Sequence, residues 1–586
     1  RRHAFFSFHR STAHLLLLHP MVRTCLLTIA LAAAAIAATA QQDRTTTPVV
    51  NVVLVGALGD LSKKYLIQAL SRVDTLRFQN PPQPELVLWP GSRSNTDKGR
   101  LAMEVILNEH LTCQQGTDYQ LAGEAHECVS NQKAFKSRVM PYRQLKHDQD
   151  YHGLNAAIEA HNKHNNYQEM GRLMYLSIPP KAYRNVSKSI ARHARPKSAT
   201  TTRSSSTDPT KPWLRVVFEK PFGSDVQSAI ELADTLGESL EEEEIYRIDH
   251  YLGKAGVRVI HAFRAQNKDI YEALLTTEHV AYVDVVMKEQ TDCAGRAGYY
   301  DDYGVVRDLH QNHLSEMMAL ALMDLPLDTQ VLEDSTKTVQ QQQSQLMAMY
   351  KAYCYDAIHK PSLAQDVVVG QYEGYQKHVE QDRAKWMTDP NDIKQRTVTP
   401  TFASVRLRVD NHRWRDTPVY LTSGKALEER EAYVRFVFKN GEELLFNVQG
   451  GGKGTHVHAT RGLPAFRVPD GWRKSSVGDA SSAPGTARTI VPNKNPGAYD
   501  HLVSKVWEGD QSHFVATDTL LASWRLWTPL LQALDTQPEP PPLYTQGGGE
   551  MYAASLELFE NTVVGRLKLM DDESGEDGVV QQAEEL

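Results

Sequence analysis

A nearly unbroken apolar run followed by a glycine turn is the feature that most restricts the fold of this chain. The run extends from Val49 to Val55 and is rich in β-branched residues, which is typical of a strand buried in a parallel sheet. Gly56 and Gly59 follow, and apolar residues then recur at helical spacing before a second predicted strand at residues 85–89. This order of strand, glycine turn, helix and strand is the opening of a doubly wound, dinucleotide-binding sheet.

The rest of the chain divides into two parts that differ in their pattern of predicted strands and helices. Strands predicted at residues 173–178 and 214–218 continue the alternation with helices. After Lys220 the strand-like runs follow one another more directly, and the two main helical stretches are residues 311–323 and 520–534. We therefore expect an α/β N-terminal Rossmann-type doubly wound domain and an α+β C-terminal domain with a large, mostly antiparallel sheet. The strand-like runs of the second part are residues 280–287, 403–409, 432–439 and 442–448.

The N-terminal region has the three parts of a secretory signal peptide. Arg23 follows Met21, an apolar run extends over residues 25–38, and Ala38-Thr39-Ala40 offers small residues for cleavage. The run is too short for a convincing membrane span, so we expect no membrane attachment after cleavage. Such a protein meets an oxidising lumen, where Cys113 and Cys128 could pair. Two free buried thiols are an equally good interpretation of that pair.

The charge distribution gives little support to a nucleic-acid partner. The formal net charge is −7, and the acidic residues between positions 571 and 586 account for all of it. The body of the chain is therefore close to neutral, without the basic face of a nucleic-acid-binding domain.

Gly56 and Gly59 leave room for a diphosphate at the start of a helix, where free backbone amides attract anions. By itself the glycine pair is equally typical of a structural turn. Arg93, just after the second strand, lies where this fold reads the adenosine ribose, and a guanidinium there accepts a 2′-phosphate. This favours NADP as the coenzyme.

The segment RIDHYLGK, residues 247–254, gathers an unusual set of side chains. His250, Tyr251 and Lys254 can donate several hydrogen bonds to a phosphate dianion. Lys220 ends a predicted strand just before Pro221, which puts an ammonium at the carboxyl edge of the sheet, where such folds bind ligands. The sequence therefore favours a phosphorylated substrate beside a nucleotide.

Several strings resemble the motifs of glucose-6-phosphate dehydrogenases. They are GALGDLSKKYL from Gly56, RIDHYLGK from Arg247, GKALEER from Gly424 and WRLWTPLL from Trp524. The resemblance extends from about Val49 to Leu534 and includes features of the hexose-6-phosphate dehydrogenase branch of the endoplasmic reticulum lumen. It implies oxidation of glucose 6-phosphate, and of other hexose 6-phosphates, to the lactone, the first step of the pentose phosphate pathway. The coenzyme implied is NADP, with NAD left open.

The resemblance also assigns roles to residues. His313, in VVRDLHQNHL, becomes the general base, Asp249 holds its far ring nitrogen, and Lys220 contacts substrate hydroxyls and the coenzyme. Other residues are expected to bind one of two partners. The substrate group is His250, Tyr251, Lys254, Glu289, Asp308, Lys425 and Arg430, and the coenzyme group is Gly56, Gly59, Asp60, Leu61, Arg93 and Lys220.

His310 and His313 lie three residues apart and raise the question of a metal site. No suitably placed third ligand emerges from the sequence, so we expect no metal and a packing role for His310. The expected segments are 1–45 (upstream sequence and signal peptide), 46–219 (NADP-binding domain), 220–570 (glucose-6-phosphate dehydrogenase C-terminal domain) and 571–586 (acidic disordered tail).

The resemblance suggests a homodimer or homotetramer formed through the second-domain sheet, and we expect a C-terminal lactonase activity to be absent or truncated away. Two alternatives remain. One is another kind of sugar oxidoreductase, but that function would not explain why His250, Lys254 and Lys425 occur together. The other is a non-catalytic nucleotide-binding relative, although no decay of Lys220, Asp249 or His313 is seen.

Overall fold

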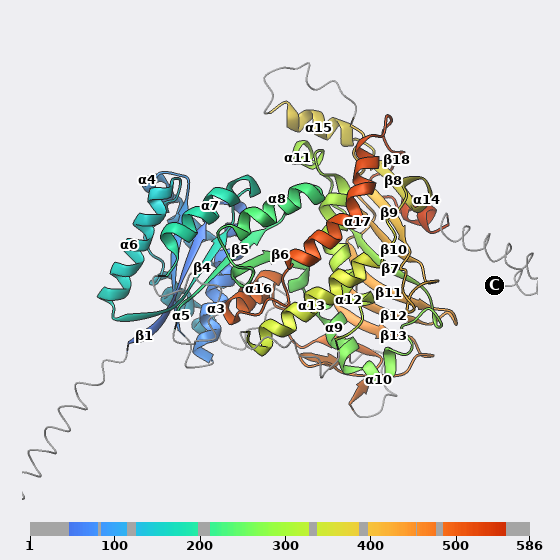
Figure 1. The fold of residues 1–586 in the computed structure, drawn as a ribbon, viewed down its shortest axis with the longest axis horizontal. Coiled ribbons are helices and arrows are strands. Elements are labelled where there is room, and N and C mark those ends of the chain that lie inside the picture. Colours follow the sequence, from blue (N-terminus) through green and yellow to red (C-terminus); the bar gives the residue numbers. More distant parts are fainter. Residues whose placement is uncertain are drawn as a thin grey trace, which may run out of the picture.

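The computed structural model contains two large sheets that lie side by side (Figure 1). It confirms the expected combination of a parallel, doubly wound sheet and a larger, mostly antiparallel one. The residues described are 46–79, 84–113, 125–196, 211–326, 337–385, 397–452, 454–475 and 485–557.

The first sheet has six strands, all parallel, because its apolar runs are joined by helical crossovers. β1 is buried along almost its whole length between β2 and β4. The strand order 3-2-1-4-5-6 is that of a dinucleotide-binding fold. In spatial order the strands are β3 (Arg143–Gln144), β2 (Glu85–Ser92), β1 (Thr47–Val55), β4 (Tyr167–Leu176), β5 (Trp213–Glu219) and β6 (Ile245–Ile248).

Helices cover both faces of the first sheet. They are η2 (Ser62–Leu66), α3 (Ile67–Gln79), α4 (Thr96–Glu109), α5 (Ala125–Lys136), α6 (Asp148–His164), η3 (Pro180–Ala182), α7 (Tyr183–Ser189), η4 (Ile190–Ala194), α8 (Val226–Gly237) and α16 (Ala498–Glu508). The last of these comes from far along the chain, and it lies against α3 in Figure 1. Leu502, Val503 and Val506 of α16 belong to the apolar core on that face.

The first sheet continues beyond residue 219, where the sequence suggested a domain boundary. β5 is followed by α8 and then by β6, which pairs with β5 in parallel. β6 is a short, fully buried strand of four residues, so its apolar pattern is too brief to be recognised in the sequence. The RIDHYLGK segment therefore begins with the last two residues of β6, Arg247 and Ile248, at the carboxyl end of the nucleotide-binding sheet.

The second sheet has ten strands, and most neighbours are antiparallel. β7 and β10, at its centre, pair in parallel. In spatial order the strands are β15 (Trp472–Lys474), β17 (Thr489–Pro492), β13 (His456–Ala459), β12 (Glu443–Gly450), β11 (Glu431–Phe438), β7 (Val280–Lys288), β10 (Val419–Gly424), β9 (Phe402–Leu407), β8 (Val367–Tyr372) and β18 (Leu543–Tyr544). β14 (Phe466–Arg467) and β16 (Thr486–Ala487) form a separate pair.

Helices of the second part pack mainly on the side of its sheet that faces the first (Figure 1). They are η6 (His250–Gly253), α9 (Ala255–Gln266), α10 (Lys268–Tyr271), α11 (Ala297–Tyr300), η7 (Val306–Leu314), α12 (Ser315–Leu322), α13 (Val339–Asp356), α14 (Leu363–Asp366), α15 (Tyr375–Arg383) and α17 (Thr517–Asp535). The short helix η5 (Glu242–Glu244) instead contacts β5 of the first sheet. α17 contacts both α8 and α13, and Trp524 in it donates a hydrogen bond of 2.9 Å to the Phe222 carbonyl.

The Gly-, Ser- and Pro-rich stretch at residues 475–496 contains two short strands: β17 pairs with β13 and β15 in the second sheet, and β16 pairs with β14. Cys113 and Cys128 form a disulfide, while Cys293 and Cys354 are free and buried. The expected signal peptide and the acidic tail lie outside the described residues. Within the described ranges, none of the helices has both the length and the apolar character needed to cross a membrane.

Candidate active site

Three candidate residues lie at the carboxyl edge of the first sheet because each directly follows a strand. Gly56 follows β1, Lys220 follows β5 and Asp249 follows β6. The parallel register pairs Val55 with Leu176, and Glu219 with Ile248, so these strand ends form one continuous edge. A ligand crevice is expected at this edge in open parallel sheets.

His313 comes from the second part of the chain and meets this edge directly. Its Nδ1 lies 2.5 Å from Asp249 Oδ1, and its Nε2 lies 3.0 Å from Lys220 Nζ. A lysine ammonium can only donate, so Nε2 carries the lone pair and the proton sits on Nδ1, facing the carboxylate. The structure thus holds the imidazole in the tautomer that a base requires.

A π-helix determines which side chains of the His313 segment share a face. η7 contains Asp308, His310 and His313. Residues five apart lie roughly one turn apart on a π-helix, so Asp308 and His313 both reach Lys220. His310 points away instead, and its ring nitrogens hydrogen-bond the Leu421 carbonyl and the Ser423 hydroxyl, both at 3.1 Å. These contacts give His310 the packing role expected of it.

The surroundings of His313 keep its ring neutral. Burial lowers the pKa of His313, Asp249 opposes this effect, and Lys220 adds to it, with a net shift below the ordinary value. Burial alone raises the pKa of Asp249, but the neighbouring His313 outweighs burial and holds that pKa well below the usual carboxyl range. The pair therefore consists of a neutral imidazole and an ionised carboxylate, both nearly inaccessible to solvent.

Lys425 follows β10 and is held between two carboxylates. Its ammonium pairs with Glu289 and lies 2.9 Å from Asp308 Oδ2. Burial lowers the pKa of Lys425, but these two carboxylates outweigh burial and raise the pKa overall. Lys220 completes the group by donating to the Asp308 carbonyl at 2.9 Å. The result is a set of fixed donors and acceptors beside His313, suited to sugar hydroxyls.

A second group of candidate residues meets around Gln449, at the end of β12. The Gln449 side-chain oxygen accepts from Lys254 and, at 3.5 Å, from Arg430, while its amide donates to the Tyr251 hydroxyl at 3.0 Å. Lys254 Nζ also lies 4.2 Å from the centre of the Tyr251 ring. Burial, and then the nearby Arg430, lower the pKa of Lys254 to about 8.

His250 lies between the two groups. Its ring packs edge-on against His313, with centroids 4.7 Å apart, and stacks with Tyr499 of α16 at 6.2 Å. Burial, and then the neighbouring His313, lower the pKa of His250 well below its ordinary value. The neutral ring can therefore donate a single hydrogen bond to a ligand.

The glycine turn has the form that a bound diphosphate needs. Gly56 has φ +91°, and a Cβ there would lie 2.0 Å from the Ser177 carbonyl oxygen, so only glycine fits. Gly59 is exposed, and Asp60 and Leu61 begin the helix that continues as η2, so backbone amides face the turn. Arg93 is exposed just after β2. These residues fit a dinucleotide with a phosphorylated ribose.

The donor atoms of Asp249, His250 and His313 lie within 4.8 Å of one another, close enough to resemble a metal site. The hydrogen bond between Asp249 and His313 Nδ1 already engages two of these atoms. The arrangement is that of a base and the carboxylate that orients it.

Sequence reasoning missed two residues of this site. Gln449 joins Lys254, Arg430 and Tyr251, and its signal was its place just before the glycine run at 450–452. Glu219 accepts a 2.6 Å hydrogen bond from Tyr175, and burial raises its pKa to about 7. Its adjacency to Lys220 was visible in the sequence, but its burial was not.

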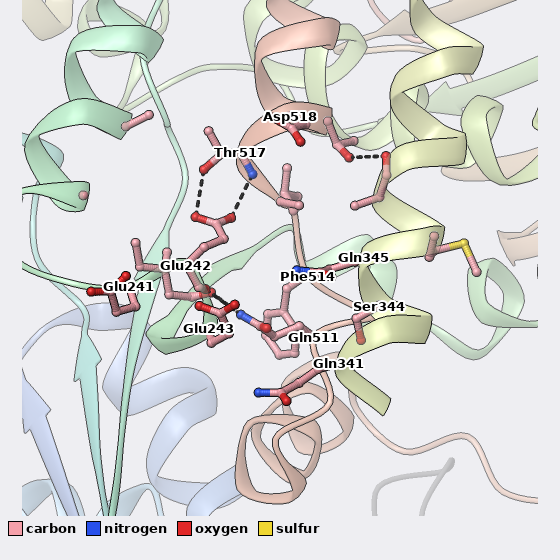
Figure 2. Close-up of a pocket in the computed structure, with 18 of the residues that line it drawn as sticks. Glu241, Glu242, Glu243, Gln341, Ser344, Gln345, Gln511, Phe514, Thr517 and Asp518 are labelled. Carbon is pink, nitrogen blue, oxygen red and sulfur yellow. Dashed lines mark hydrogen bonds between the residues drawn. The ribbon is translucent and has the colours of Figure 1, made fainter. Parts of the chain in front are cut away.

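A large cavity in the described part of the chain lies away from this site. Figure 2 shows it between η5, α13 and the segment that leads into α17, with a volume of about 880 Å³. Glu241, Glu242 and Glu243 line one wall, while Gln341 and Gln345 line another. None of the predicted site residues borders it.

The two sheets and the buried acid–base group define a class: two-domain proteins in which a dinucleotide-binding sheet supplies one wall of a site and an α+β domain supplies the other. Residues 53–258 match the family described as "Glucose-6-phosphate dehydrogenase, NAD binding domain", and residues 261–562 match "Glucose-6-phosphate dehydrogenase, C-terminal domain". The chain belongs to the glucose-6-phosphate dehydrogenase family.

Several known proteins are similar to the chain. It is 33% identical to "GDH/6PGL endoplasmic bifunctional protein" of Homo sapiens, over 83% of this chain and 59% of that protein. It is 31% identical to "Glucose-6-phosphate 1-dehydrogenase 5, cytoplasmic" of Arabidopsis thaliana, over 84% of this chain and 87% of that protein. The chain thus spans less than two thirds of the human bifunctional protein.

Among solved structures, the chain superposes on "Glucose-6-phosphate dehydrogenase in complex with its substrate glucose-6-phosphate". The TM-score is 0.65 and the sequence identity is 25%, over 86% of this chain and 95% of that one.

Proposed function

We propose that the protein oxidises glucose 6-phosphate, and other hexose 6-phosphates, to 6-phosphogluconolactone with NADP as hydride acceptor. The observation that carries the proposal is the contact of Lys220 and Asp249 with the two ring nitrogens of His313. The family match supports this reaction, and so does the similar structure described as a complex with glucose 6-phosphate.

In the proposed reaction His313 removes the proton of the anomeric hydroxyl. Nε2 is the free base nitrogen, and the substrate hydroxyl takes the place that Lys220 Nζ occupies beside it. The imidazolium that forms is stabilised by the Asp249 carboxylate on Nδ1. NADP, when bound, supplies the hydride acceptor for the hydrogen on the same carbon.

The substrate is proposed to lie across the two groups of candidate residues. Glu289 and Asp308 would bind the sugar hydroxyls. Lys220, which contacts both Asp308 and His313, would bind them as well. Lys254 and Arg430, joined by Gln449, would bind the phosphate with help from Tyr251 and His250. Lys425, held by Glu289 and Asp308, would also contribute positive charge toward the phosphate.

The coenzyme is proposed to occupy the glycine turn. Gly56 and Gly59 leave its diphosphate free of side chains, the amides of Asp60 and Leu61 face it, and Arg93 would take the 2′-phosphate. Lys220 contacts His313 and follows β5 at the same sheet edge as the turn, so it would contact both ligands. We keep NAD as a second acceptor that kinetics can compare directly.

We also propose that the protein works as a homodimer or homotetramer in the endoplasmic reticulum lumen, where it supplies NADPH. The Cys113–Cys128 disulfide supports an oxidising compartment, and the human and rabbit relatives are named as endoplasmic. Light scattering of the purified protein tests the assembly, and a monomer alone would contradict it. Cell fractionation tests the location.

The activity is tested by coenzyme reduction with purified protein, glucose 6-phosphate and either NADP or NAD. We expect turnover with the phosphorylated sugar, much less with free glucose, and a loss of about 10³-fold in His313→Ala. A rate equal to that of His313→Ala would contradict the proposal. Thermal stabilisation by NADP without turnover would instead indicate a non-catalytic nucleotide-binding relative.

A further inference from the structure

A second cavity, of about 480 Å³, lies between α9, α12, α13 and the segment before α17. This size is within the range of small-molecule pockets. Part of its wall is apolar, with Leu252, Leu320 and Leu346. Its polar side chains are mostly basic or imidazole groups, namely Arg258, His261, Lys268, Lys351 and His513.

Arg258 is the unusual member of this lining. No ion pair or side-chain hydrogen bond of its guanidinium is found among the described residues, and its Nε is buried without a partner. Arg264, on the same helix, shows the normal arrangement, because Glu272 accepts from its Nε and its NH2 group, both at 2.9 Å. Burial lowers the pKa of Arg258 to about 10. A half-buried arginine without a counter-ion is costly, which makes it a signal for a missing anion.

The groups around Arg258 do not supply that anion. Asp510 is engaged by Lys505 at 3.1 Å, and Glu316 is engaged by Lys351 at 2.8 Å. Two imidazoles also lie close enough for Arg258 to lower their pKa: the rings of His501 and His513 meet edge-on with centroids 4.8 Å apart, and His501 Nε2 is also buried without a partner.

We propose that this cavity is a binding site for a small molecule that carries an oxyanion group on an apolar body. Arg258 lines the cavity, and a guanidinium can offer two parallel N–H donors, which match the geometry of a phosphate or carboxylate. His261 and His513 are neutral, because burial lowers the pKa of each to about 4, and they add single donors. The leucine wall would hold the apolar part of the ligand.

The cavity differs in charge from its neighbour in Figure 2. The two cavities share Met347, Lys351 and Ser512, yet the larger one is lined by Glu241, Glu242 and their acidic neighbours. An anion would be repelled from that wall and attracted to Arg258. The charge contrast therefore limits an anionic ligand to the smaller cavity.

The proposal is tested by calorimetric titration of the full chain with three probes: inorganic phosphate, AMP and octanoate. We expect at least one probe to bind with an affinity that falls tenfold or more in Arg258→Met. Arg415→Met is the matched control, because it removes the same charge from an exposed side chain outside the cavity, and its affinity should equal that of the wild type. The probe that binds most tightly identifies the ligand chemistry. Phosphate would indicate that the oxyanion alone is sufficient, AMP a phosphate on a larger body, and octanoate a carboxylate on an apolar chain.

Absence of binding by all three probes, or equal binding by Arg258→Met and the wild type, would overturn the proposal. A thermal melt gives an independent reading. Without an anion, Arg258→Met should melt at a higher temperature than the wild type, because it removes a half-buried charge that has no counter-ion. If Arg258→Met does not fold, His513→Gln replaces it in the titration, and unchanged affinity in that variant would equally reject the site.

Discussion

The two ends of the candidate active site handle charge in opposite ways. At the acid–base end, Asp249 faces His313 and Asp308 faces Lys425, so each charge or lone pair already has its partner. At the phosphate end, Lys254 and Arg430 share only the neutral Gln449, and no carboxylate pairs with either among the described residues. The first end is preorganised for proton transfer, while the second keeps positive charge available for a ligand.

This difference separates the kinetic parameters that each end should control. Groups that are locked together before binding act mainly on the reacting atoms, so their loss should lower kcat. Cations without counter-ions gain their partner when the substrate binds, so their loss should raise KM. The following changes test this separation in order of expected effect.

Asp249→Asn should give the largest loss, with kcat lowered about 10²- to 10⁴-fold and little change in KM. The amide would donate to His313 Nδ1 and so put the ring proton on Nε2, which removes the base. Steady-state kinetics measure the change. Asp366→Asn is a control, because that buried carboxylate pairs with Arg406 and Arg408 in the second sheet. Equal loss of kcat in both variants would show that general destabilisation is the cause.

Lys254→Met should raise KM for glucose 6-phosphate about 10- to 100-fold while kcat changes little, because a hydrogen bond from a charged donor is lost. Reaction with free glucose should be unaffected. The exposed Lys360→Met serves as the charge control. A fall in kcat with unchanged KM would place Lys254 at the acid–base end and break the proposed division.

The two ends should also titrate on opposite limbs of the pH profile. Since the pKa of His313 is lowered, the base stays neutral, and kcat/KM should fall only when pH drops below the ordinary imidazole range. Lys254 is charged below its pKa of about 8, so KM should rise as pH increases through that value, up to about tenfold per pH unit. Kinetics across both limbs check this, and Lys254→Met should remove the alkaline rise. An alkaline limb that persists in that variant would contradict the assignment.

Gln449→Leu should have the smallest effect, a rise in KM of about 2- to 10-fold with kcat preserved. The substitution keeps the side-chain size but removes the group that accepts from Lys254 and donates to Tyr251. Competition by inorganic phosphate measures the same end of the site without catalysis. Unchanged KM and phosphate affinity would show that Gln449 only fills space.

The residues of the nucleotide half of the site could be predicted from short, contiguous stretches of the sequence. Gly56 follows a run whose buried, parallel character was visible from its apolar residues, and its positive φ follows from the turn that such a fold requires. Lys220 and RIDHYLGK were likewise recognised as contiguous strings. The short strand β6 was not recognised, because four buried residues are too few to show a periodic pattern of apolar side chains.

The sequence by itself determined the order of the elements and the kinds of side chain that reach the site. Only the tertiary structure decided which of them meet. η7 is a π-helix, and this turns Asp308 and His313 together toward Lys220 while His310 faces Ser423. Gln449 joins Lys254 from nearly two hundred residues away. The physical reason is that periodicity reports which face of an element is apolar, whereas contacts between distant elements, and the charges left without partners, depend on how those faces pack.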